Sequence, residues 1–305
     1  NSIASGGNYN VAVGDEAGTA LTTGDDSVFV GYAAGDAIST GTQNVAIGSN
    51  ALGTGVTATN NVAVGRASMA ATLGSENVAV GVNTLAANQG GSHSVAIGSA
   101  ALTAQNPASG NVDFYNVAVG SSAGTAITTG TKNTLIGGLA GDALNTGGAN
   151  VAVGYAALST EDGNGNNVAV GYLALTTQNT GADGHNTGVG HKAGRNITTG
   201  VQNTFVGALV GDASTEGVHN VAMGYAALTT DTKGNYSVAI GAGALATQNF
   251  TTATSAYNVC VGEDAGNDIT TGIGNTLIGG LAGDVLNDAD SNTAVGYLAL
   301  TADTL

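Results

Sequence analysis

The side chains best suited to catalysis or metal binding are four histidines and one cysteine. Their spacing matches no catalytic or metal-binding motif. The histidines stand at different places along the chain: His93, His185, His191 and His219. They form neither the His-x-x-x-His nor the His-Glu pattern that marks metal-dependent hydrolases. Cys260 is the single cysteine, which excludes an internal disulfide and a multi-cysteine metal site. We therefore expect no enzyme activity, no metal and no cofactor.

Carboxylates and hydroxyls recur more regularly. A Gly-Asp pair recurs at four places, Asp36, Asp142, Asp212 and Asp284. Carboxylate oxygens are the ligands that Ca²⁺ prefers, but aspartate is also a common turn-capping residue, and we favour turn capping. Thr-Thr-Gly triplets, beginning at Thr22, Thr128, Thr198 and Thr270, raise the alternative of an ice-binding surface.

Composition excludes several classes of protein. The 305 residues include 21 acidic and 5 basic side chains, a net charge of -16. Binding to nucleic acid or to an anionic membrane surface requires the opposite charge. No apolar run approaches the ~18 residues of a membrane-spanning helix. With 51 Gly, four Phe and no Trp, the chain lacks the bulky side chains needed to fill a thick core.

A short tandem repeat predicts the fold. The pattern Asn/Ser-Val/Thr-x-Val/Ile-Gly, with Met223 as one departure, occurs seventeen times, and twelve of the sixteen intervals between its closing glycines are 17 residues. A strict short period over nearly the whole chain is typical of a solenoid, in which each repeat contacts its neighbours. We therefore predict an all-β fold, a parallel β-solenoid or β-roll of about seventeen rungs. It would form a single elongated domain over residues 1–305, with repeats from about 8 to 300, as a fragment of a longer fibre.

Each repeat alternates with period two, which indicates a strand with two faces. In the first repeat, Val11 and Val13 share one face and Ala12 lies on the other. We expect the valines to point into the solenoid and the middle residue to point outward. Asn opens fourteen of the seventeen strands, so its amide should hydrogen-bond from rung to rung.

The middle position is apolar in every rung except that of Gly188. An apolar stripe exposed on a monomer would cause aggregation, so we expect copies of the chain to bury it against one another. The predicted trimer interface contains the small and large members of this column: Ala12, Phe29, Ala46, Leu135, Phe205, Cys260 and Leu277.

The second half of the repeat shows a compensation of side-chain volume. Four residues past the closing glycine stands either another glycine, as in Gly35, or a bulky residue, as in Leu175. Most Gly-type rungs carry Leu or Ile three residues later, where Leu-type rungs are mostly polar. One large apolar group per rung is the pattern expected of a narrow, close-packed core.

Three insertions separate blocks of rungs, near residues 104–115, 178–185 and 247–257. Extra residues in a solenoid bulge outward, and binding surfaces commonly form on such loops. The candidate contact residues in these loops are aromatic or imidazole side chains: Phe114, Tyr115, His185, Phe250 and Tyr257. We expect them to contact a partner through stacking.

At the strand motif the chain resembles a known family. Ser94-Val95-Ala96-Ile97-Gly98 and Ser237-Val238-Ala239-Ile240-Gly241 are similar to the head repeats of YadA-like trimeric autotransporter adhesins, and also to bacteriophage tail-fibre repeats. The resemblance covers about residues 8–300. It implies a left-handed parallel β-roll, a homotrimer and a role in attachment. The period of about 17 is longer than that of the adhesin heads.

These observations lead to an expected function. We expect a non-enzymatic fibrous attachment protein, either a surface adhesin or a phage tail-fibre segment, located outside a cell or on a virion. Its partners would be other copies of itself and a cell-surface glycan or protein. The alternative is a structural subunit that stacks head to tail into an extracellular filament, and an ice-binding solenoid is a further one.

Overall fold

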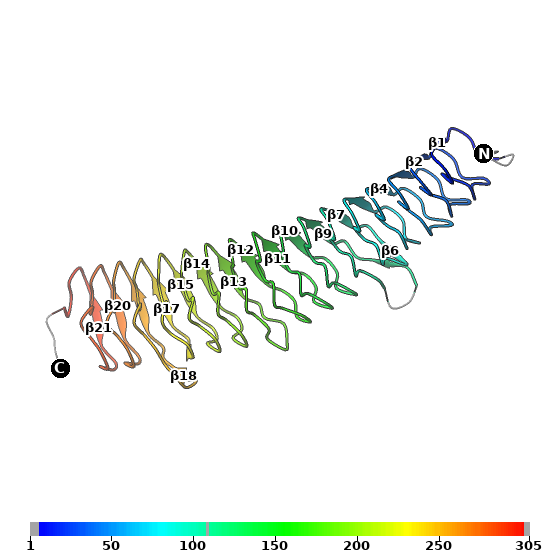
Figure 1. Cartoon of the computed structure of the whole chain (residues 1–305). Coiled ribbons are helices and arrows are strands. Elements are labelled where there is room, and N and C mark those ends of the chain that lie inside the picture. The colour runs from blue at the N-terminus through cyan, green and yellow to red at the C-terminus, as the bar shows by residue number, and fades with distance from the viewer. Residues whose placement is uncertain (1–5, 108–109, 302–305) are drawn as a thin grey trace. The chain divides into compact units, whose positions relative to one another are not determined.

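The computed structural model describes residues 6–107 and 110–301. The chain divides into two compact units, Asn1–Asn150 and Val151–Leu305. Within the described residues both units consist of strands and turns, with no helix, and each is a parallel β-solenoid (Figure 1). The prediction of an all-β parallel solenoid with a period of about 17 residues is confirmed.

The strands of the first unit lie side by side, one per rung. Its eight main strands are β1 (Val11–Val13), β2 (Val28–Val30), β3 (Val45–Ile47), β4 (Val62–Val64), β5 (Val78–Val80), β7 (Val95–Ile97), β9 (Val117–Val119) and β10 (Thr134–Ile136). Each pairs in parallel with the next, in register, so that Ala46 lies opposite Ala63 and Ala63 opposite Ala79. A second small sheet joins β6 (Gly91–Ser92) and β8 (Val112–Asp113).

The second unit repeats this arrangement. Its nine main strands are β11 (Val151–Val153), β12 (Val168–Val170), β13 (Thr187–Val189), β14 (Thr204–Val206), β15 (Val221–Met223), β17 (Val238–Ile240), β19 (Val259–Val261), β20 (Thr276–Ile278) and β21 (Thr293–Val295). The register holds across insertions, since Cys260 lies opposite both Ala239 and Leu277. Here β16 (Gly234–Asn235) pairs with β18 (Thr254–Ser255).

The glycine that closes each main strand is required by the backbone. Gly171 has a φ of 139°, a conformation that residues with side chains avoid, and a Cβ there would lie 2.2 Å from the carbonyl oxygen of Gly190 in the next rung. The rungs therefore stack in direct backbone contact at this corner. No other residue type allows that approach.

The strand-opening asparagines form the predicted rung-to-rung ladder. The backbone N–H of Asn133 donates to Oδ1 of Asn116 over 2.9 Å, while Nδ2 of Asn133 donates to the carbonyl of Gly147 over 2.9 Å. The same pair of bonds holds Asn203 in the second unit. Both asparagines are fully buried, so the ladder satisfies polar backbone groups inside the solenoid.

The core is filled in two alternating ways, as the volume pattern predicts. In Leu-type rungs a leucine such as Leu175 adopts a φ of 47° and fills the interior from the corner. Gly-type rungs occur in consecutive pairs, and in the second rung of each pair the large residue instead comes from the middle of the strand. Phe205 is one such residue, and a Cβ on Gly194 or on Gly211 would approach its ring to 2.8 Å. Glycine at the corner therefore makes room for the ring.

Candidate interaction surfaces

The side chains at the middle of the main strands lie inside the solenoid. Of the seven residues predicted to form an interface between chains, Phe29, Ala46, Leu135, Phe205, Cys260 and Leu277 are completely buried within a single chain, and only Ala12 in the first strand is exposed. The predicted orientation of the strand is therefore wrong. These six side chains are core residues and cannot meet a second copy without unfolding.

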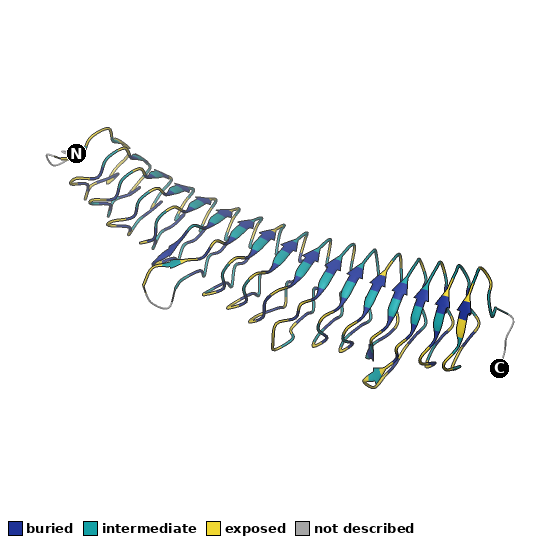
Figure 2. Ribbon diagram, turned by 180° about the vertical axis from the view of Figure 1, so that it is seen from behind, coloured by how far each residue is buried: buried dark blue, intermediate teal, exposed yellow. Residues whose placement is uncertain are grey.

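The physical reason is the narrowness of the interior. Alanine fits at the middle position because the opposite corner contributes a leucine, whereas a valine at every inward position would overfill the space. Outward β-branched side chains suit the pleated surface of a sheet and partly cover one another along the column. Figure 2 shows the resulting alternation of buried and less buried positions along the strands.

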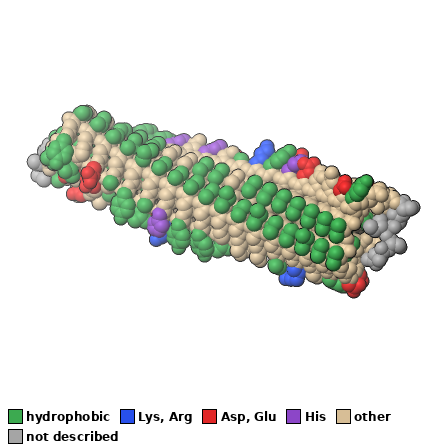
Figure 3. Space-filling model, turned by 90° about the horizontal axis from the view of Figure 1, so that it is seen from above, with side chains coloured by type: hydrophobic (Ala, Val, Ile, Leu, Met, Phe, Trp, Pro, Cys, Tyr) green, Lys and Arg blue, Asp and Glu red, His purple; other side chains and the backbone are tan. Residues whose placement is uncertain are grey.

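The residues on either side of each middle position form an apolar outer face. We use this name for the first and third residues of the main strands of each unit, which are Val, Thr, Ile or Met throughout. In the second unit Met223 is 44% exposed and Ile278 is 40% exposed. Hydrophobic side chains stand in regular rows on the surface in Figure 3. A continuous uncharged apolar surface of this kind is typical of an interaction site.

Two of the insertion residues predicted to contact a partner are buried. Phe114 is fully buried and Phe250 is 6% exposed, so neither can stack on a partner and this part of the prediction is wrong. Each ring occupies space left by a glycine, because a Cβ on Gly91 would lie 2.6 Å from Phe114 and one on Gly234 would lie 2.9 Å from Phe250. The two phenylalanines fasten their insertions to the solenoid.

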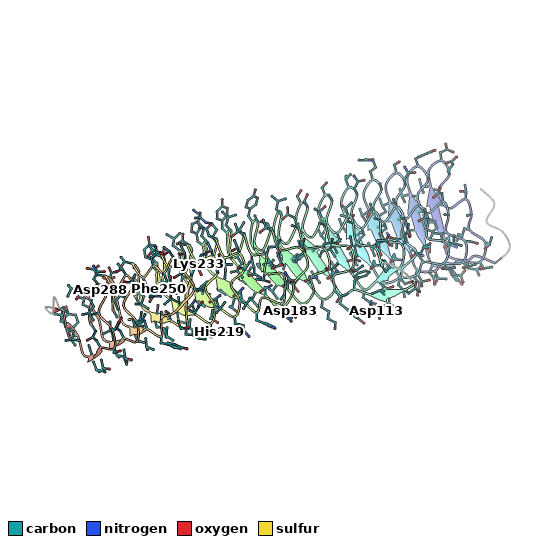
Figure 4. All side chains as sticks on the ribbon, turned by 90° about the horizontal axis from the view of Figure 1, so that it is seen from below. Asp113, Asp183, His219, Lys233, Phe250 and Asp288 are labelled. Carbon is teal, nitrogen blue, oxygen red and sulfur yellow. The ribbon has the colours of Figure 1, made fainter. Side chains whose placement is uncertain are left out.

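The rung that precedes each insertion contains a buried glutamine. In every case it accepts a hydrogen bond from the asparagine that reopens the strand ladder after the insertion, over 2.8–3.1 Å. The three pairs are Gln105 with Asn116, Gln178 with Asn186, and Gln248 with Asn258. The glutamine therefore links the asparagine after each insertion to the rung before it. Asp113, Asp183 and Phe250, one residue from each insertion, are labelled in Figure 4.

Tyr115, His185 and Tyr257 are exposed, as predicted for partner contacts. Their partner is untested, but the structure shows that two of them already contact neighbouring rings. The ring of Tyr115 stacks on His93 with a centroid distance of 5.0 Å, and the ring of Tyr257 stacks on Tyr236 at 5.1 Å.

Tyr155 and Tyr172 directly follow closing glycines, which predicts a position at a corner, but the stacking of such rings into ladders was not predicted. Two such ladders run through the second unit: Tyr155, Tyr172 and His191 at one corner, and His219, Tyr236 and Tyr257 at another. Neighbouring rings are nearly parallel, with interplanar angles of 9–15°. Aligning the repeats on their closing glycines reveals both ladders, because the three rings of each ladder then fall in one column.

His93 ties three rungs of the first unit together. Its Nε2 lies 3.0 Å from Oε2 of Glu76, and its Nδ1 lies 3.0 Å from Oδ1 of Asp113. Asp113 belongs to β8 in the first insertion, so this contact and the stacking on Tyr115 hold the insertion against the solenoid.

The Gly-Asp corners are partly buried. The Oδ1 atoms of Asp36, Asp142 and Asp284 are buried without a hydrogen-bond partner, and burial raises the pKa of Asp36 and of Asp142. Near Asp284 a cavity of about 180 Å³ is also lined by Asp264 and Asp268. Among residues 6–107 and 110–301, no group of three or more His, Cys, Asp or Glu side chains has a geometry that could hold a metal ion.

Two carboxylates lie in the interior without a cationic partner. Glu161 accepts hydrogen bonds from Nδ2 of Asn164 over 2.7 Å and from Nε2 of Gln178 over 3.0 Å. Asp231 accepts two backbone N–H bonds over 3.0 Å, from Gly234 and from Phe250. Desolvation raises the pKa of both carboxyls, and the hydrogen bonds oppose that rise without cancelling it.

These two carboxyls predict that the protein becomes less stable as the pH rises. A carboxyl whose pKa is higher in the folded state binds more protons when folded, so stability is lost as the pH increases through that pKa. The urea midpoint should fall as the pH rises above about 4, the ordinary range of a carboxyl pKa. The fall should be smaller in Glu161→Gln and Asp231→Asn. These amides have natural precedents, because Gln178 and Asn88 occupy the equivalent position in other rungs. A midpoint with the same pH dependence in wild type and variants would contradict the prediction.

The remaining polar candidates serve the fold. Burial raises the pKa of the Cys260 thiol to about 12, so it stays protonated and inert at neutral pH. Among the Thr-Thr-Gly triplets, Oγ1 of Thr22 and of Thr198 donates to a backbone carbonyl of the next rung over 3.0–3.1 Å. These two hydroxyls use their proton to join neighbouring rungs, and the ice-binding alternative stays a prediction.

Comparison of the chain with models of known families and with curated proteins finds no match. The described residues contain no helix long and apolar enough to cross a membrane.

Proposed function

We propose that the chain is a segment of a non-enzymatic fibrous attachment protein that acts outside a cell or on a virion as a parallel homotrimer. The observation that carries this proposal is the apolar outer face. It presents two columns of side chains, β-branched except for Met223, in rung-to-rung register, for example Val168 and Val170 opposite Thr187 and Val189. The resemblance to trimeric adhesin heads supplies the left-handed winding and the three-fold symmetry.

Charge supports the same arrangement. The chain carries a net charge of -16, yet no position of the outer face is charged. Copies can therefore bring these faces together without placing like charges in contact, while the acidic remainder keeps the assembly soluble. Association would remove from water a surface that is costly to expose.

Attachment would then come from weak contacts repeated on each copy. Tyr115, His185 and Tyr257 are exposed, and a trimer presents each of them three times. Linked weak sites gain avidity because the second and third contacts form within the same complex.

The experiment measures retention of the protein on immobilised mucin glycoprotein. We expect wild type to dissociate at least about 100-fold more slowly than Met223→Lys, whose charge on the outer face prevents association. Gln202→Lys is the matched control, since it adds the same charge at an exposed corner where Lys132 stands in another rung. Failure of wild type to be retained, or equal dissociation of wild type and Met223→Lys, would refute multivalent attachment.

A further inference from the structure

One aromatic ladder ends at a gap in its own column. His219, Tyr236 and Tyr257 each stand directly before a strand-opening residue, and their rings stack with centroid distances of 5.0 and 5.1 Å. The next two residues in this column are Gly274 and Ser291. Tyr236 therefore has a ring on both sides, whereas the far face of Tyr257 looks over a residue without a side chain.

The glycine is not required by the backbone at this corner. Gly274 has a φ of 71°, close to the 50° of Tyr257 and the 60° of Ser291, so the column accepts side chains in this conformation. A Cβ on Gly274 would lie 3.5 Å from Oγ of Ser291, which is ordinary contact, with nothing closer. The absent side chain leaves a slot between Tyr257 and Ser291, open to solvent because all three residues are exposed.

The spacing of the rungs leaves room for one sugar ring over Gly274. Two rung spacings separate Tyr257 from Ser291, roughly 10 Å. A ring stacked about 4 Å from the tyrosine face would occupy the middle of this space. Its far side would face the hydroxyl of Ser291, which can donate or accept a hydrogen bond. A pyranose suits both sides of the slot. Its apolar C–H face can pack against the ring of Tyr257, and its hydroxyls can hydrogen-bond with Ser291.

A negative charge beside the slot favours neutral sugars over acidic ones. Asp290 is exposed and its Oδ1 accepts the backbone N–H of Ile273, the residue before Gly274, over 2.7 Å. A carboxylate beside the slot repels sialic and uronic acids. A neutral pyranose meets no such repulsion, and the galacto configuration has the most continuous C–H face.

We propose that Tyr257, Gly274 and Ser291 form a binding site for a neutral pyranose, with a β-galactoside as the best-fitting class. This proposal rests on the proposed attachment function and names its ligand. Tyr172 is not an equivalent site, because it has a ring on both of its faces.

The test is saturation-transfer NMR with methyl β-D-galactopyranoside at up to about 50 mM, well above the dissociation constant near ~1 mM expected for a single small ring. Wild type and Tyr257→Phe should transfer saturation to the sugar protons H3, H4 and H5. Tyr257→Ala and Gly274→Asn should lose the signal at least tenfold. Gly274→Asn fills the slot and should fold normally, since Asn60 and Asn166 occupy this column with φ of 59° and 62°. Tyr172→Ala is the control for a general loss of aromatic surface, and the signal should persist.

Absence of a signal in wild type, or an undiminished signal in Gly274→Asn, overturns the sugar site. If the protein is nevertheless retained on mucin, the attachment proposal survives and only its ligand is wrong. Signal from methyl β-D-glucuronide equal to that from the galactoside would overturn the charge selection.

Discussion

Phe205→Ala is expected to lower the free energy of unfolding by about 3–5 kcal/mol, the usual cost of emptying a large buried aromatic position. The ring of Phe205 is completely buried and lies over the two corner glycines, Gly194 and Gly211. Neither of these two corner positions has a side chain that could fill the space. Urea unfolding followed by circular dichroism measures the loss.

Two further variants show whether volume is the cause. Phe205→Leu should cost less than about 1.5 kcal/mol, because Leu135 and Leu277 occupy the same place in other blocks. Combining Phe205→Ala with Gly211→Leu should recover at least half of the loss. That pair converts the rung to the Leu type, and Ser214 already supplies the polar residue that mostly accompanies a corner leucine. No recovery in the double variant would show that the two core arrangements are not interchangeable.

Met223→Lys is expected to abolish association of the chain, weakening it at least about a thousandfold, or about 4 kcal/mol. Met223 lies on the outer face at the end of β15 and is 44% exposed, so lysine should fold there as a monomer. In a trimer three added charges would approach one another out of water. Ile278→Lys should act in the same way from β20.

Sedimentation velocity compares these variants with Gln202→Lys. We expect monomers for Met223→Lys and Ile278→Lys, and wild-type behaviour for Gln202→Lys. Continued association of both outer-face variants would exclude this face as the interface. Circular dichroism like that of wild type confirms that the monomeric variants are folded.

The repeat made most of the fold predictable. The fixed spacing of the closing glycines set the number of rungs, and the column of asparagines located the ladder that Asn133 and Asn203 form. Alternation along the strand also showed correctly that there are two faces. It carries no information on which face is inside, since either set of side chains can point inward.

Which face of the strand points inward could be inferred from a correlation between two positions of the repeat, the middle of the strand and the corner. Phe29, Leu135, Phe205 and Leu277 all stand in rungs whose corner residue is glycine, and a Cβ on each of those glycines would collide with the large residue. Residues that compensate one another's volume must share the same interior. This correlation can be seen in the sequence alone. It predicts that the middle residue of the strand points inward and that Val170 and Met223 point outward.

The candidate site was predictable only in part. The prediction that aromatic side chains of the insertions are exposed is correct for Tyr115 and Tyr257. Aromatic residues in loops can also be buried and hold the loop against the rest of the fold. Phe114 and Phe250 lie opposite Gly91 and Gly234, and the contact depends on how β8 and β18 fold back onto β6 and β16. That folding involves residues about 20 positions apart and leaves no local signal.

The mass of the protein in solution, measured by light scattering after size-exclusion chromatography, tests the central claim that the outer face joins three copies. One chain has a mass of 29.2 kDa, and three chains give 3 × 29.2 = 87.6 kDa. A trimer joined through the outer face would give a single species near 88 kDa. A stable monomer of 29.2 kDa with its apolar outer face in water would contradict this claim, and a mass that rises without limit would favour the head-to-tail filament instead.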